Sequence, residues 1–184
     1  MALSISDMFR AKMKSTKDPR MFEEASADYA YPTGFLSFDY MNGTVVHVKS
    51  AERNFKYYSV GIQDGCFVMA IGRSGCGKTT WVVQTAANIV RPFPKACIFH
   101  DDIEGGITEY RKEILTGFNT EELKEKYISR NTGITAENVY ERIKIIHDLK
   151  LENRSEYEYD TGLFDSNGDR IFKLVPTVYI IDSI

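Results

Sequence analysis

The sequence contains few cysteines, and those that it contains form no recognisable pattern. They are Cys66, Cys76 and Cys97, an odd number without a C-x-x-C spacing, which argues against a disulfide framework and against a zinc site. Long apolar runs are lacking too. No stretch approaches the roughly 20 residues that a membrane-spanning helix needs, and the first residues carry no apolar signal region. We therefore expect a soluble protein of a reducing compartment, with no membrane partner.

A large excess of charge of one sign is also lacking. The net charge is -3 at pH 7, which gives no global electrostatic reason to expect a nucleic-acid or membrane surface. Hydrophobic residues make up 43% of the 184 residues, enough for one globular domain with a core. Strand-like and helix-like segments alternate along the chain, which predicts an α/β fold with a mostly parallel sheet flanked by helices.

The chain divides into a short N-terminal part, residues 1–30, and a core, residues 31–184. In the first part, apolar residues at helical spacing and several Lys and Arg residues predict a basic amphipathic helix, which a linker follows. This part is a candidate oligomerisation arm. Two stretches look like insertions into a compact core, residues 44–59 and residues 152–174, and we assign no mechanism to either. The second contains Asn167-Gly168, a strong signal for a hairpin turn.

Apolar patterns and end signals predict the elements of the core. Strands are expected over residues 66–71, 95–100, 128–131 and 178–181. Helices are expected over residues 77–90, 107–115, 120–127 and 135–150. The last of these helices has Thr135 at its cap position.

A glycine-rich segment, GRSGCGKTT, fits the phosphate-binding pattern G-x-x-x-x-G-K-[ST]. An apolar strand is expected before it and a helix after it, so that loop and helix N–H groups converge on phosphate oxygens. Lys78 is expected to reach the β and γ phosphates, and the Thr79 hydroxyl to bind Mg²⁺. The expected nucleotide-binding residues are Gly72, Arg73, Ser74, Gly75, Cys76, Gly77, Lys78, Thr79 and Thr80.

A site for a nucleotide and Mg²⁺ needs a second acid at the end of a neighbouring buried strand. Asp182 follows the apolar residues 178–181 and supplies that acid, as in a Walker B strand. We therefore predict that Asp182 and Thr79 share the metal. The alternative is an aspartate that caps a core strand.

Further acids follow the strand at residues 95–100. Asp101, Asp102 and Glu104 lie where open α/β sheets bind ligands, and one of them is a candidate to polarise the attacking water. The alternative is a set of solvated loop carboxylates with a helix cap. His100 is expected to pack or to cap, since the residues around it give little support for a metal role.

Several other nucleotide enzymes fit less well. The segment DSNGD, residues 165–169, contains the D-x-x-G pattern of a GTPase, but the base-reading motif N-K-x-D of that class is absent. The same segment resembles the start of a calcium-binding loop, but Pro176 stands where the calcium-binding Glu belongs. We interpret it as the hairpin turn. An AAA-type ATPase normally has Glu after the Walker B Asp, whereas Ser183 follows here.

Four segments, in order along residues 31–184, together resemble RecA-type ATPases, most closely the phage RecA-like recombinases. They are PTGFLSFDYMNG, with Phe38 in place of a leucine, GIQDGCFVMAIGRSGCGKTT, IFHDDIEGGIT and VYIIDSI. A weaker likeness is that of Phe22–Ala25 to the F-x-x-A segment by which some relatives dock on a neighbouring subunit. In the family, further strands and DNA-binding loops follow the last segment, so we expect this sequence to stop within the ATPase domain.

The resemblance implies an ATP- and Mg²⁺-dependent recombinase that assembles on single-stranded DNA as a filament or ring of identical subunits, in the cytoplasm of a bacterium or a phage-infected host. It places water activation on Glu104, phosphate binding and catalysis on Lys78, and the metal on Thr79 and Asp182. Alternatives are a DnaB-type replicative helicase of the same lineage, a P-loop small-molecule kinase and a non-enzymatic interaction module. The resemblance also implies weak hydrolysis by residues 1–184 alone, because RecA-type sites are completed by neighbouring subunits.

Overall fold

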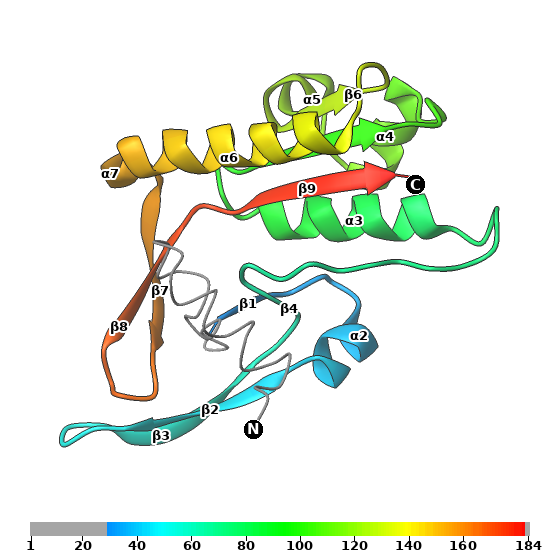
Figure 1. Ribbon diagram of the computed structural model, residues 1–184. Coiled ribbons are helices and arrows are strands. Elements are labelled where there is room, and N and C mark those ends of the chain that lie inside the picture. The colour runs from blue at the N-terminus through cyan, green and yellow to red at the C-terminus, as the bar shows by residue number, and fades with distance from the viewer. Residues whose placement is uncertain (1–28, 183–184) are drawn as a thin grey trace, which may run out of the picture.

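The computed structural model describes residues 29–182 of the chain. The expected N-terminal helix, the segment Phe22–Ala25 and Ser183 lie outside the described residues. Within them the fold is mixed α/β, built around a small parallel sheet with helices on both sides and three antiparallel strand pairs (Figure 1).

The central sheet contains three parallel strands in the order β6-β5-β9. Their bounds are β5 Cys97–Asp102, β6 Tyr127–Arg130 and β9 Thr177–Asp182. In β5 the residues Ile98 and His100 are fully buried, and the strand lies between its two neighbours. Because all three strands run in the same direction, their carboxyl ends meet at one edge of the sheet.

Helix α3, Lys78–Val90, supplies the main apolar contact with one face of the sheet. Its side chains Val83, Ala87 and Val90 are fully buried in the core with Ile98 and Ile180. Helix α6, Ala136–Glu152, lies on the opposite side of the sheet (Figure 1). The sheet is thus covered on both faces, as alternating strands and helices predict.

Three short helices complete the core, α4 Glu109–Thr116, α5 Thr120–Lys126 and α7 Arg154–Tyr157. Cap residues explain where several helices begin: Thr108 and Thr135 accept from backbone N–H groups at the starts of α4 and α6, and Asn119 forms a capping box with Glu122 in α5. The four predicted helices are therefore confirmed within two residues at each end. Among the described residues, no helix has the length and apolar character needed to cross a membrane.

Residues 33–39 form a buried polar turn that is hydrogen-bonded to α3. The Asp39 carboxylate accepts from the backbone N–H groups of Thr33 and Gly34, at 2.8 and 3.1 Å. Asn88 of α3 donates to the Thr33 carbonyl at 2.8 Å. Helix α2, Leu36–Met41, follows this turn.

The remaining strands form three antiparallel pairs, and two of these pairs are the stretches that resemble insertions. The pairs are β1 Ala30–Tyr31 with β4 Ile62–Gln63, β2 Thr44–Lys49 with β3 Asn54–Ser59, and β7 Glu158–Phe164 with β8 Arg170–Leu174. The two insertion hairpins contact each other, since Lys49 N–H donates to the Ser166 carbonyl at 3.1 Å and the Arg53 guanidinium lies 3.9 Å from the Phe164 ring centre. The hairpin predicted from Asn167-Gly168 is confirmed, and the Asp165 carboxylate closes its turn by accepting from the N–H groups of Asn167 and Asp169.

The strand predicted over residues 66–71 is wrong. These residues form no strand, and Phe67, Met69 and Ile71 are 80%, 67% and 86% exposed. A strand exists only where neighbouring backbones take its hydrogen bonds. In the described part of the chain β9 pairs only with β5, and residues 66–71 are drawn as coil on the side of α3 away from β9 (Figure 1).

Candidate nucleotide and metal site

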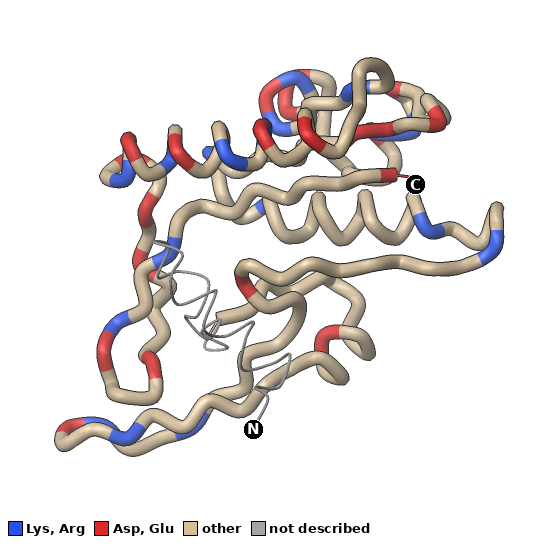
Figure 2. Tube along the Cα trace, viewed as in Figure 1, with Lys and Arg blue, Asp and Glu red and all other residues tan. Residues whose placement is uncertain are grey.

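The predicted site residues meet at the carboxyl ends of β5 and β9, beside the start of α3. Asp102 and Asp182 are direct partners in the parallel register of these strands. The Ile103 N–H extends the pairing by one residue, donating to the Asp182 carbonyl at 3.3 Å. Figure 2 shows an acidic residue at the end of β9, and basic residues in the loop before α3 and at the start of α3.

The phosphate-binding loop has a backbone that depends on glycine. Gly75 and Gly77 have φ of 74° and 90°, in the left-handed region where a side chain is strained. At Gly72 a Cβ atom would lie 2.6 Å from the Cys76 sulfur, so a side chain there would force the loop open. Both glycines of the motif, Gly72 and Gly77, and the additional Gly75 are therefore favoured by the conformation of the loop itself.

The loop presents its donors at the start of α3. Gly77 is the N-cap residue and gives no side-chain cap, so the first turn of the helix has N–H groups and a positive dipole end for an anion. The Lys78 ammonium donates to the carbonyls of Gly72 and Arg73 at 3.0 and 3.1 Å. This holds a positive charge within the loop, where a phosphate would lie.

Thr79 and Asp182 are in direct contact. The Thr79 hydroxyl donates to Asp182 Oδ2 at 2.6 Å, although the two residues are 103 positions apart. The first turn of α3 and the end of β9 thus bring together two oxygen donors of the type that Mg²⁺ binds. The structure places the two predicted metal-binding residues as a pair.

The acids of β5 point to opposite faces of the sheet, because side chains alternate along a strand. Asp101 is buried and faces α6, where Arg142 Nη1 donates to its two oxygens at 2.6 and 2.8 Å and the Tyr179 hydroxyl donates at 2.5 Å. Burial and the neighbouring Asp101 carboxylate raise the pKa of Tyr179 to about 12. Asp101 is therefore held by partners on the face away from the phosphate-binding loop.

Asp102 faces the other way and is also buried. Its Oδ2 accepts from the Ile107 N–H at 3.1 Å and so closes the loop that follows β5. The interpretation as solvated loop carboxylates is thus wrong for Asp101 and Asp102, which are 3% and 6% exposed. Glu104 lies in that loop and is exposed.

A hollow of about 230 Å³ opens beside this loop. Asp102, Ile107 and Lys112 contribute to its lining, so it borders the carboxyl ends of β5 and β6. Lys112 is buried and donates to Glu109 Oε1 at 2.5 Å and to the Ser129 hydroxyl at 2.8 Å. The edge of the sheet thus combines a cation, several acids and open space.

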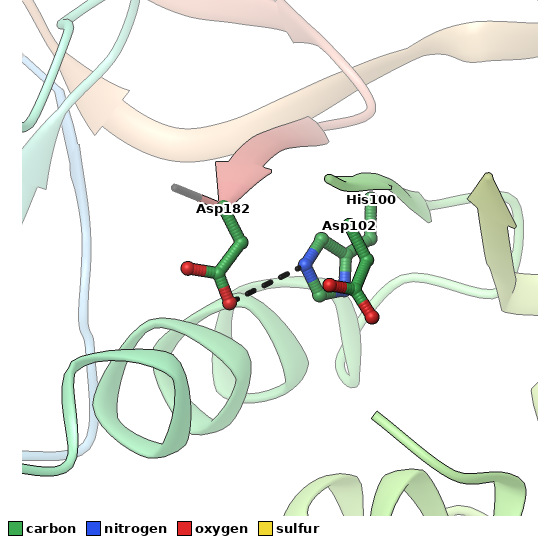
Figure 3. Close-up of side chains that lie close together, drawn as sticks. All are labelled: His100, Asp102 and Asp182. Atoms are coloured by element: carbon green, nitrogen blue, oxygen red, sulfur yellow. Dashed lines mark ion pairs between the residues drawn. The ribbon is translucent and has the colours of Figure 1, made fainter. Parts of the chain in front are cut away.

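His100 lies on the same face of β5 as Asp102 and is 1% exposed. Its Nδ1 lies 2.6 Å from the Tyr127 hydroxyl oxygen, and its Nε2 lies 3.9 Å from Asp182 Oδ2 (Figure 3). Burial lowers the pKa of His100, while the carboxylates of Asp102 and Asp182 act in the opposite direction. Burial also raises the pKa of Tyr127, which keeps its phenol protonated.

Sequence reasoning missed the roles of Tyr127 and Arg142 at this edge, whereas His100 packs in the buried sheet, as one of its two expected roles requires. The first two depend on contacts between distant segments that no local pattern indicates. The spacing of two residues between His100 and Asp102 indicates that both side chains lie on one face of the strand.

The chain matches no family model, no curated protein and no solved structure.

Proposed function

We propose that this chain is the ATP-binding core of a RecA-like recombinase, a DNA-dependent ATPase that acts in homologous recombination. The observation that carries the proposal is the 2.6 Å contact between the Thr79 hydroxyl and Asp182 Oδ2. It joins the P-loop to the acid at the end of a parallel strand, which is the pairing that a site for Mg²⁺ and ATP requires. The four ordered sequence segments supply the narrower assignment to RecA-like recombinases.

In this proposal each residue of the site has a role that follows from the chemistry of its side chain. Lys78 and the N–H groups at the start of α3 bind the phosphate oxygens. Thr79 and Asp182 are hard oxygen donors that fit Mg²⁺, which when bound neutralises charge on the phosphoryl oxygens. Glu104, exposed in the loop after β5, orients the attacking water.

Nucleotide binding is tested by calorimetric titration of ATP with Mg²⁺ into the chain. Lys78→Ala removes the ammonium of the loop and is expected to weaken binding at least about tenfold, about 1.4 kcal/mol. Lys144→Ala is the matched control, since Lys144 is an exposed lysine of α6. Equal affinity for wild type and Lys78→Ala would show that the loop binds no nucleotide.

The DNA-dependent part of the proposal needs a separate experiment that measures ATP hydrolysis. We expect single-stranded DNA to increase ATP hydrolysis, and Glu104→Gln to abolish the increase while ATP still binds. Glu141→Gln, a change of an exposed α6 glutamate, is the control. Full hydrolysis by Glu104→Gln, or no response to DNA, would contradict the proposal.

The same preparations distinguish the alternatives. Filaments of identical subunits on single strands support the recombinase. Closed hexameric rings that unwind a fork identify a replicative helicase. Phosphorylation of a metabolite without any response to DNA identifies a small-molecule kinase.

A further inference from the structure

Three metal-ligating side chains converge where β5 and β9 end. They are His100 and Asp102 of β5 and Asp182 of β9, and one ligand atom from each lies within 4.8 Å of the others. His100 and Asp102 share a face of β5, and the parallel register puts Asp182 directly beside Asp102 (Figure 3). The convergence is therefore a property of two paired strands, not of a flexible loop.

The imidazole of His100 has an unused nitrogen aimed into this cluster. Among the described residues, Nε2 makes no hydrogen bond, although the side chain is 0% exposed. A buried polar atom without a partner costs free energy, so it calls for a ligand. Figure 3 shows the ring directed at the Asp182 carboxylate, with Asp102 beside it.

Tyr127 fixes the orientation of the ring from the other side. Its hydroxyl oxygen lies 2.6 Å from Nδ1, and when it accepts from Nδ1–H the lone pair of Nε2 is directed at the two carboxylates. A hydrogen bond to the second ring nitrogen is the usual support of a metal-binding histidine. Asp102 has comparable support, because its Oδ2 accepts from the Ile107 N–H.

The charge of Asp102 also favours a cation at this position. Asp102 is 6% exposed, and within residues 29–182 it makes no ion pair with Lys or Arg. The Asp182 side chain is 18% exposed and lies next to it in register. Two adjacent, largely buried carboxylates repel each other, and a dication beside a neutral imidazole would balance them.

We propose that His100 Nε2, Asp102 and Asp182 bind a divalent transition-metal ion of the zinc type. Imidazole nitrogen with carboxylate oxygen suits Zn²⁺, whereas Mg²⁺ prefers oxygen alone. Bonds of about 2.1 Å put tetrahedral ligands about 3.4 Å apart, so the 3.9 Å between His100 Nε2 and Asp182 Oδ2 must close by about half an ångström. This site differs from the Thr79–Asp182 pair assigned to Mg²⁺ and shares only Asp182 with it.

Zn²⁺ binding is measured on the metal-stripped chain without nucleotide, so the result is independent of ATP binding. Because Cys66 and Cys76 are exposed thiols, the measurement uses a Cys66→Ser/Cys76→Ser background. Competition with a chromophoric chelator is expected to give one Zn²⁺ per chain, with a rise in Tm on Zn²⁺ addition. Asp102→Asn, which retains an acceptor for the Ile107 N–H, is expected to lower the affinity at least about 100-fold and to remove the rise in Tm.

Two further variants separate direct ligation from general destabilisation. Tyr127→Phe removes the support of Nδ1 and is expected to lower the affinity about tenfold, less than loss of a direct ligand. His147→Ala, a change of an exposed α6 histidine, is expected to bind Zn²⁺ as the background does. The proposal is overturned if the background binds no Zn²⁺, or if Asp102→Asn binds it equally well.

Discussion

Replacing Arg142 with methionine is expected to destabilise the fold strongly, because it leaves the carboxylate of Asp101 buried without its cation. In the wild type Arg142 Nη1 lies 2.6 and 2.8 Å from the two Asp101 oxygens, and the side chains are 17% and 4% exposed. Loss of one partner of such a pair costs about 3–5 kcal/mol. The Tyr179 hydroxyl still donates to Asp101, so we expect the lower end, about 3 kcal/mol.

Urea denaturation followed by circular dichroism measures this effect. With a slope of about 2 kcal/mol per molar urea, 3 kcal/mol lowers the midpoint by about 1.5 M. The double variant Arg142→Met/Asp101→Asn is expected to recover part of the loss, since no buried charge remains. Arg170→Met removes an arginine of a more exposed ion pair and should leave the midpoint nearly unchanged. A midpoint shift below about 0.5 M for Arg142→Met would refute the structural role of Asp101.

Two other predictions concern the coil before the P-loop and a buried lysine. Ile71→Ala is expected to change the free energy of unfolding by less than about 0.5 kcal/mol, since Ile71 is 86% exposed, whereas Ile98→Ala, at a fully buried site, is expected to cost about 2–5 kcal/mol. Equal losses in urea denaturation would mean that residues 66–71 form a buried strand after all. Burial lowers the pKa of Lys150 below its ordinary value near 10.4. The unfolded chain therefore binds more protons in that window, and the stability of the wild type relative to Lys150→Met is expected to rise with pH between the lowered pKa and about 10.4. A difference that stays constant or falls over that range would contradict the burial of the ammonium.

The helices of this fold could be read from the sequence because their signals are local. Thr135 precedes an apolar pattern of helical period, and its side chain accepts from the Asn138 N–H as a cap does. The P-loop glycines similarly report a local backbone conformation, with positive φ at Gly75 and Gly77. Such features need no information about the rest of the chain.

The strand predicted over residues 66–71 does not form, because strand formation depends on residues far away in the sequence. Phe67, Met69 and Ile71 have the apolar character of a buried strand, and no pattern within them shows whether a neighbouring strand is present. Their exposure follows from the pairing of β9 with β5 alone among the described strands. Strand formation is a non-local property, which a local pattern indicates only in part.

One part of the site could be predicted because a phosphate-binding loop requires an acid elsewhere in the chain. The P-loop required an acid at a strand end, and the contact between Thr79 and Asp182 agrees with that requirement. Asp101 and Asp102 face opposite sides of the sheet because side chains alternate along a strand, and each has different partners. The partner of Asp101, Arg142, lies 41 residues away on another element, beyond the reach of local reasoning.

The central claim, that the P-loop and Asp182 form one site for ATP and Mg²⁺, is tested most directly by the metal dependence of ATP binding. ATP is titrated into wild type, Asp182→Asn and the control Asp148→Asn, an exposed α6 position, each with Mg²⁺ and with EDTA. For wild type and Asp148→Asn we predict that Mg²⁺ tightens ATP binding at least about tenfold, and that Asp182→Asn loses this gain. If Asp182→Asn retained the full effect of Mg²⁺, the contact between Thr79 and Asp182 would not be a metal site and the account would be wrong.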